Sequence, residues 1–176
     1  MERAMNDRSA ARRDDLARRF GFDSWPGEGD QAVRVSGFEF ADGDVPGYRR
    51  HRVVRPPTPP GVVAVHESVW VDAEKPESDD AVLLVDVYES ESHEAAKEAL
   101  LNLLGQVQSA DVERIEGIGD VAFSPGEGAV FFVRGNVAVR VLAGGPAAEP
   151  VLERARTVDE GIRGRSEGQR PSARRS

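Results

Sequence analysis

Residues 130–142 read VFFVR-GN-VAVRVL, two apolar runs joined by Gly135 and Asn136. Glycine followed by asparagine is typical of a type II′ hairpin turn, in which the first central residue has a positive φ. A two-residue turn also fixes the register of its strands. The expected cross-strand pairs are Phe132 with Val139, Val130 with Val141, and Phe131 with Arg140.

This hairpin is expected to be apolar on both faces. One face carries Val130, Phe132, Val137, Val139 and Val141, and the other carries Phe131, Val133, Ala138, Arg140 and Leu142. A sheet with one solvated face shows polar residues there. We therefore expect a helix or a partner protein to cover the second face, where Phe131, Val133 and Arg140 are candidate binding residues.

Alternating patterns bounded by turn residues predict further strands around the hairpin. They lie at 33–40 (VRVSGFEF, with a bulge at Gly37), 48–55 (YRRHRVVR), 62–72, 81–89 (AVLLVDVYE), 112–115 and 121–123. The prolines of PPTPPG at 56–61 cannot pair inside a sheet, so we expect an exposed connection there.

Apolar residues at helical spacing predict two amphipathic helices. The first begins after Ser92, a suitable N-cap, and carries Ala96, Leu100, Leu103, Leu104 and Val107 on one face. The second opens at Pro150, ends near Gly164, and carries Val151, Leu152, Ala155, Val158 and Ile162 inward. A short N-terminal helix over 9–20 would place Leu16, Ala17 and Phe20 on one side.

This order of elements predicts an α+β fold, an antiparallel sheet of six to seven strands with helices on one face. Two successive βββα units, 48–107 and 112–162, are consistent with an internal duplication. We expect an N-terminal helix and linker over 1–30 and a single domain over 31–164. The basic segment 165–176 is almost without apolar residues and is expected to be a disordered tail.

The charge balance and the terminal sequences exclude some classes of function. Residues 61–128 hold sixteen acidic side chains against three basic ones, within a net charge of −8, which disfavours nucleic acid as a partner. The sequence has no cysteine, which excludes thiol catalysis. It has no apolar run long enough for a membrane span, and no signal-peptide core in residues 1–20. We expect a cytoplasmic protein, or a secreted one if a leader has been removed.

Few groups suggest chemistry. A metal site of His66, His93 and Asp86 has no supporting spacing, and His93 is expected to be solvated in the first turn of its helix. The acidic loop 72–80 lacks the order of a calcium loop. The glycine segments 117–120 and 126–128 lack the lysine of a phosphate-binding loop and predict turns. We therefore expect no catalytic residue, no metal and no cofactor.

The segment 48–55 is the one stretch with binding character. Strand alternation predicts Arg50, Arg52 and Val54 on one side, and Arg49, His51, Val53 and Arg55 on the other, with Tyr48 at the start. Two interpretations are open. The arginines could bind an anion, or their charges could protect an edge strand from pairing with other chains.

The runs GIGDVAF (117–123), AVFFVRGNVAVRV (129–141) and VLERARTVDEGI (151–162) resemble the C-terminal part of uncharacterised bacterial extracytoplasmic domains. The resemblance covers about a quarter of the chain and implies a non-enzymatic accessory or binding role in a bacterial protein. We expect no leader in residues 1–20, which would be a departure from those domains.

Taken together, these patterns predict a non-catalytic binding or protein-interaction domain, with a protein partner or self-association through the sheet. No motif indicates a small-molecule ligand. Two alternatives stay open: a small hydrolase or metal-dependent enzyme with a site assembled across the fold, and an anion-binding module at Arg49–Arg55.

Overall fold

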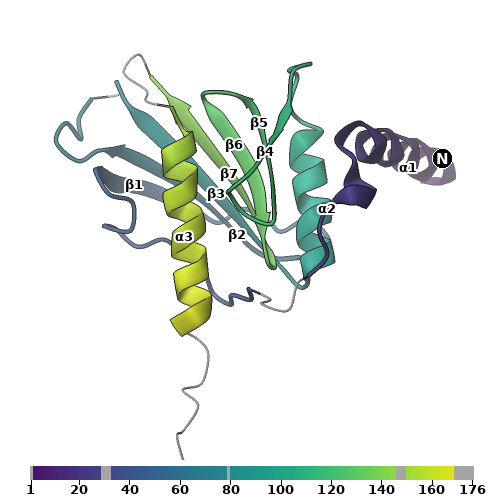
Figure 1. The fold of residues 1–176 in the computed structure, drawn as a ribbon, viewed down its shortest axis with the longest axis horizontal. Helices are drawn as coiled ribbons and strands as arrows, with labels where there is room; N and C mark the ends of the chain where they lie inside the picture. The colour runs from purple at the N-terminus through teal and green to yellow at the C-terminus, as the bar shows by residue number, and fades with distance from the viewer. Residues whose placement is uncertain (1, 29–32, 79, 146–149, 169–176) are drawn as a thin grey trace, which may run out of the picture.

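Figure 1 shows the fold, a single sheet flanked by helices, in a computed structural model that describes residues 2–28, 33–78, 80–145 and 150–168. The strands are β1 (Tyr48–Val54), β2 (Val62–Asp72), β3 (Val82–Ser90), β4 (Glu113–Ile115), β5 (Val121–Gly126), β6 (Ala129–Arg134) and β7 (Val137–Gly144). The helices are α1 (Glu2–Phe20), the 3-10 turn η1 (Phe22–Ser24), α2 (His93–Leu104) and α3 (Leu152–Gly168). All neighbouring strands are antiparallel, in the order β1-β2-β3-β7-β6-β5-β4, which confirms the α+β class.

The β6–β7 hairpin has the expected turn and register. A type II′ turn requires a positive φ at its first central residue and a negative φ at its second. Gly135 has a φ of 57°, and Asn136 is not among the described residues with a positive φ. All three predicted cross-strand pairs are confirmed. The turn is further held by Asp120, whose Oδ2 accepts a hydrogen bond of 2.7 Å from the Gly135 N–H.

The expectation that both amphipathic helices lie on one face of the sheet is wrong, because each helix covers a different face. Helix α3 packs on the face that carries Phe132 and Val139, and α2 packs on the face that carries Phe131 and Val133. We call these the α3 face and the α2 face. The inward residues predicted for both helices are confirmed, and the Ser92 side chain caps α2.

The repeated order of elements is not accompanied by repeated packing. Three strands precede α2, whereas four strands lie between α2 and α3 in the chain. The two helices also lie on opposite faces of the sheet. The last strand of each group, β3 and β7, pair with each other at the centre of the sheet.

Residues 33–40 do not form the predicted strand. They cross the α3 face as an extended loop that buries Val35, Phe38 and Phe40. Side chains replace the missing strand partner: Asn136 Oδ1 accepts from the Val35 N–H at 2.9 Å, and Asn136 Nδ2 donates to the Val35 carbonyl at 3.0 Å. The Glu89 carboxylate accepts from the N–H groups of the next turn, at Gly37 and Phe38.

The N-terminal region also differs from the expected linker. Helix α1 begins at Glu2, earlier than expected, and the segment after it places Phe22 and Trp25 in the core beneath α2. The Trp25 indole N–H donates to the Phe20 carbonyl at 2.9 Å, which anchors this segment. At the other end α3 continues past Gly164 to Gly168, and residues 169–176 of the expected tail lie outside the described residues.

Candidate functional site

The basic strand β1 is an edge strand of the sheet, but it does not alternate as predicted. The register with β2 shifts between Arg50 and Arg52, so one extra residue, His51, bulges out of the pairing. Arg49 pairs with Val71 and Arg52 pairs with Val69, so both arginines lie on the α2 face. Arg50 and Val53, opposite Trp70 and Ser68, lie on the α3 face instead.

Part of the α2 face is not covered by a helix. Leu83 and Val141, on the α3 face, are fully buried, whereas their neighbours Leu84 and Leu142, on the α2 face, are partly exposed. Across the strands, Arg52, Val69, Leu84 and Leu142 stand in register as one row. We define the open face as Arg49, Arg52, Val54, Val69, Leu84 and Leu142.

The four arginines of residues 49–55 divide by what they contact. Arg50 donates to Glu39 Oε1 at 3.2 Å and to the Phe40 carbonyl at 2.7 Å, and Arg55 donates to Glu39 Oε2 at 2.6 Å. These two arginines therefore fasten the edge strand to the loop that crosses the α3 face. The side chains of Arg49 and Arg52 are exposed and have no hydrogen-bond or ion-pair partner within the described parts of the chain.

Tyr48 and Arg140, two further candidate binding residues, have structural contacts. Tyr48 packs against the core of the α3 face, with the Arg154 guanidinium 5.1 Å from its ring centroid. Arg140 donates to Asp86 Oδ2 from Nε at 2.8 Å, beside the open face. Burial raises the pKa of the Asp86 carboxyl above its ordinary value, and the hydrogen bonds from Arg140 offset only part of this effect.

Phe131 and Val133 belong to the core and not to the surface. Their exposed fractions are 4% and 0%, and they pack beneath α2 together with Leu100 and Leu104. The apolar second face of the hairpin is thus covered by a helix of the same chain. A partner cannot reach these two side chains while α2 is in place.

Of the three residues considered for a metal site, Asp86 and His93 have structural contacts, whereas His66 Nδ1 is buried without a hydrogen-bond partner among the described residues. His93 is buried, contrary to expectation, with Nδ1 at 2.7 Å from the Gly135 carbonyl and Nε2 at 3.1 Å from the Pro26 carbonyl. Arg134 donates to both carboxylate oxygens of Asp159 at 2.7 Å and to Asp120 at 3.2 Å. No group of three or more His, Asp or Glu side chains in the described part of the structure could hold a metal ion.

Comparisons with protein-family profiles, with curated proteins and with solved structures gave no match for this chain. The resemblance to bacterial extracytoplasmic domains is therefore neither supported nor contradicted and stays a prediction. None of the helices described here combines the length and the apolar character needed to cross a membrane.

The segment 48–55, which contributes two arginines to the open face, could be predicted from the sequence, but the surface itself could not. The bulge at His51 determines which arginines point to the open side, and no residue in YRRHRVV signals a bulge. Val69, Leu84 and Leu142 come from three separate strands, so only the sheet order brings them into one row with Arg52.

Proposed function

We propose that this chain is a non-catalytic binding domain that holds an acidic, partly apolar protein segment on the open face. The observation that carries the proposal is the pair of unpartnered cations, Arg49 and Arg52, beside the partly exposed row of Val69, Leu84 and Leu142. Partly exposed apolar side chains on a sheet suit an extended peptide, and exposed guanidinium groups suit its carboxylates.

This proposal combines and narrows two of the functions expected from the sequence. We still propose an interaction domain, but its binding surface is the open face and not Phe131 and Val133, which are buried. The anion-binding role is restricted to Arg49 and Arg52, since Glu39 already occupies Arg50 and Arg55. An accessory or binding role is also what the resemblance to extracytoplasmic domains implies.

An NMR titration tests the proposal with a defined probe, a peptide of alternating glutamate and leucine. We expect amide shifts in β1, β2, β3 and β7, and binding that weakens with added salt because exposed charges are screened. The double variant Arg49→Ser/Arg52→Ser should weaken binding about a hundredfold or more, because it removes two charge-assisted contacts of about 1.5–3 kcal/mol each.

The matched control is Arg50→Ser/Arg55→Ser, which removes the same charge from the same segment, 49–55, but from the two arginines that donate to Glu39. It should bind the peptide nearly as well as the unaltered chain while losing some stability. The proposal is wrong if both double variants bind equally, or if a lysine–leucine peptide binds as tightly as the glutamate–leucine one.

A further inference from the structure

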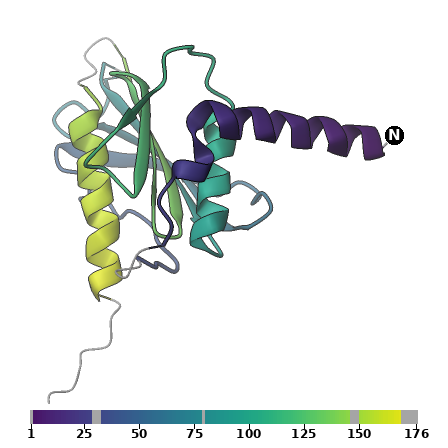
Figure 2. The same ribbon diagram turned by 45° about the vertical axis from the view of Figure 1, so that its right-hand side comes forward.

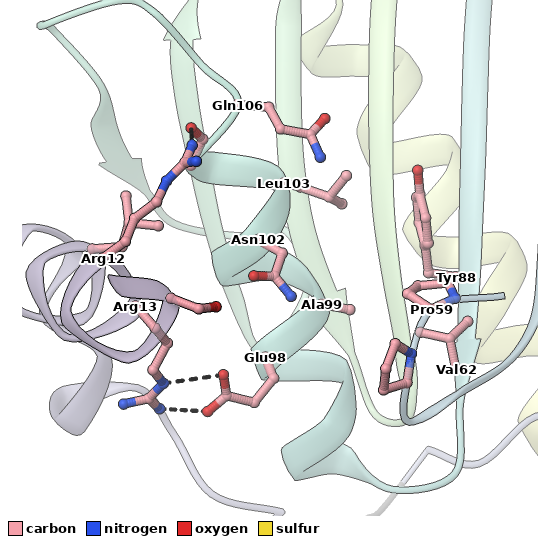
Figure 3. Close-up of a pocket in the computed structure, with 14 residues that line it drawn as sticks. Arg12, Arg13, Pro59, Val62, Tyr88, Glu98, Ala99, Asn102, Leu103 and Gln106 are labelled. Atoms are coloured by element: carbon pink, nitrogen blue, oxygen red, sulfur yellow. Dashed lines mark hydrogen bonds and ion pairs between the residues drawn. The ribbon is translucent and has the colours of Figure 1, made fainter. Parts of the chain in front are cut away.

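A groove runs along the outer side of α2, between α1 and the proline-rich connection that follows β1. Figure 3 shows it, with α1 on one side and Pro59 and Tyr88 on the other. Its volume is about 620 Å³. Ser9, Arg12 and Leu16 line it from α1, and Ala99 and Leu103 line it from α2. An ion pair between Arg13 and Glu98, drawn in Figure 3, holds the two helices at this spacing.

No described part of the chain covers the first half of α1. Figure 2 shows the helix extending away from the sheet, with its N-terminal end farthest out. Every residue from 4 to 12 is exposed, and Met5, at 67%, is the most exposed large apolar side chain described. A helical segment this short and polar is marginal in water without tertiary contacts.

The side of α1 that faces the groove continues into this uncovered half. Ser9, Arg12 and Leu16 are spaced by three and four residues, and four residues before Ser9 the same stripe reaches Met5. Spacing of three and four is that of the contact seam between paired helices. The stripe is also self-complementary: in an antiparallel pair Met5 of one helix meets Leu16 of the other, and Ser9 meets Arg12.

We propose that two copies of this chain associate through α1, the exposed half of each α1 lying antiparallel to its counterpart in the groove of the other copy. A two-fold axis makes every such contact twice, so one modest seam yields a closed dimer. The dimer does not depend on the proposed peptide-binding function, because the groove and the open face share no residue.

Added salt should have opposite effects on dimerisation through α1 and on peptide binding at the open face. Helix α1 has six arginines and four acidic residues, so two copies of it repel each other. Added salt screens that repulsion and should favour the dimer, whereas it should weaken peptide binding at Arg49 and Arg52.

Sedimentation analysis of the full chain over a range of concentrations tests the dimer. We expect a dimer for the unaltered chain and a loss of at least tenfold in dimer affinity for Met5→Glu, whose side chain is exposed and not needed for folding. Ala11→Glu is the matched control, an exposed apolar-to-acidic change on the opposite side of α1, and should leave the dimer intact. A monomeric unaltered chain, or a dimer that Met5→Glu leaves unchanged, overturns the proposal.

The chain has no cysteine, so introduced thiols report the arrangement directly. A mixture of Met5→Cys and Leu16→Cys chains should form mixed disulfides, whereas Met5→Cys alone should not cross-link. Ser9→Cys mixed with Arg12→Cys repeats the test at two exposed positions, in case Leu16→Cys disturbs the packed side of α1. Cross-linking of Met5→Cys with itself would mean parallel helices and would overturn the antiparallel pairing.

Discussion

At the scale of the single residue, Gly135 is the point where distant parts of the chain meet. Its N–H donates to Asp120, and its carbonyl oxygen lies 2.7 Å from His93 Nδ1. A Cβ at this position would lie 1.7 Å from the Val33 carbonyl oxygen, far inside van der Waals contact. The residue therefore needs both a positive φ and the absence of a side chain.

Gly135→Val should destabilise the chain by about 3 kcal/mol or more, because backbone strain and the overlap with Val33 add to each other. Urea unfolding measures the loss. Gly37→Val is the matched control: Gly37 has a φ of 64°, but a Cβ there meets no atom within 4 Å. It should cost only the strain, about 1–3 kcal/mol. Equal losses for the two variants would contradict the close approach of Val33.

Asp159 is the second residue whose removal should be costly. Its carboxylate, 4% exposed, accepts two hydrogen bonds from Arg134 and one from the Gly119 N–H. Asp159→Ala should cost about 3–5 kcal/mol, since it leaves a largely buried guanidinium without its main partner.

The control for Asp159→Ala is Asp15→Ala, in the exposed pair with Arg18 on α1. It should change the free energy of unfolding by less than about 1 kcal/mol. Thermal or urea unfolding of both variants measures the difference. A small loss for Asp159→Ala would show that Arg134 finds other acceptors.

At the scale of the element, the loop that crosses the α3 face fastens β1 to the rest of the fold through Glu39. The hydrogen bond from Arg55 lowers the pKa of the Glu39 carboxyl below its ordinary value of 4.5, against the opposing effect of burial. A folded-state pKa below the unfolded one means that the charged carboxylate stabilises the fold above the unfolded value. That contribution is lost as the pH falls through the folded-state pKa.

Glu39→Gln should therefore be less stable than the unaltered chain at neutral pH, and the difference should shrink as the pH falls from about 5 to 3. Urea unfolding at each pH measures it. The control is Glu74→Gln, in the exposed loop after β2, for which we expect little difference at any pH. A gap for Glu39→Gln that stays constant over this range would show that the carboxylate charge is not what stabilises the loop.

The elements that could be predicted from the sequence are those fixed by neighbours in the chain. The hairpin register follows from Gly135 and Asn136, and the side of each helix that packs inward follows from the apolar spacing along α2 and α3. Residues 33–40 have a strand-like pattern, yet the partners of their backbone are the side chains of Glu89 and Asn136, more than fifty residues away in sequence. No local pattern could indicate that.

At the scale of the whole molecule, both proposed interaction surfaces lie on the α2 side of the sheet. Helix α3 and the crossing loop bury the opposite side, from Trp70 and Leu83 to Val141. Helix α2 covers only part of its own side and leaves the open face at one end and the groove along its outer surface. The order of elements did not predict which face each helix covers, and that choice decides where the two proposed surfaces lie.

The sheet separates two hydrophobic cores, and each of them contains one tryptophan whose fluorescence can report on it. The chain has two tryptophans, Trp25 in the core beneath α2 and Trp70 in the core beneath α3. Fluorescence of Trp25→Phe therefore follows one core alone, and that of Trp70→Phe follows the other. Because every central strand contributes side chains to both cores, we expect the two signals to change at the same fraction of total unfolding. Separate transitions would mean that one layer can melt while the sheet persists.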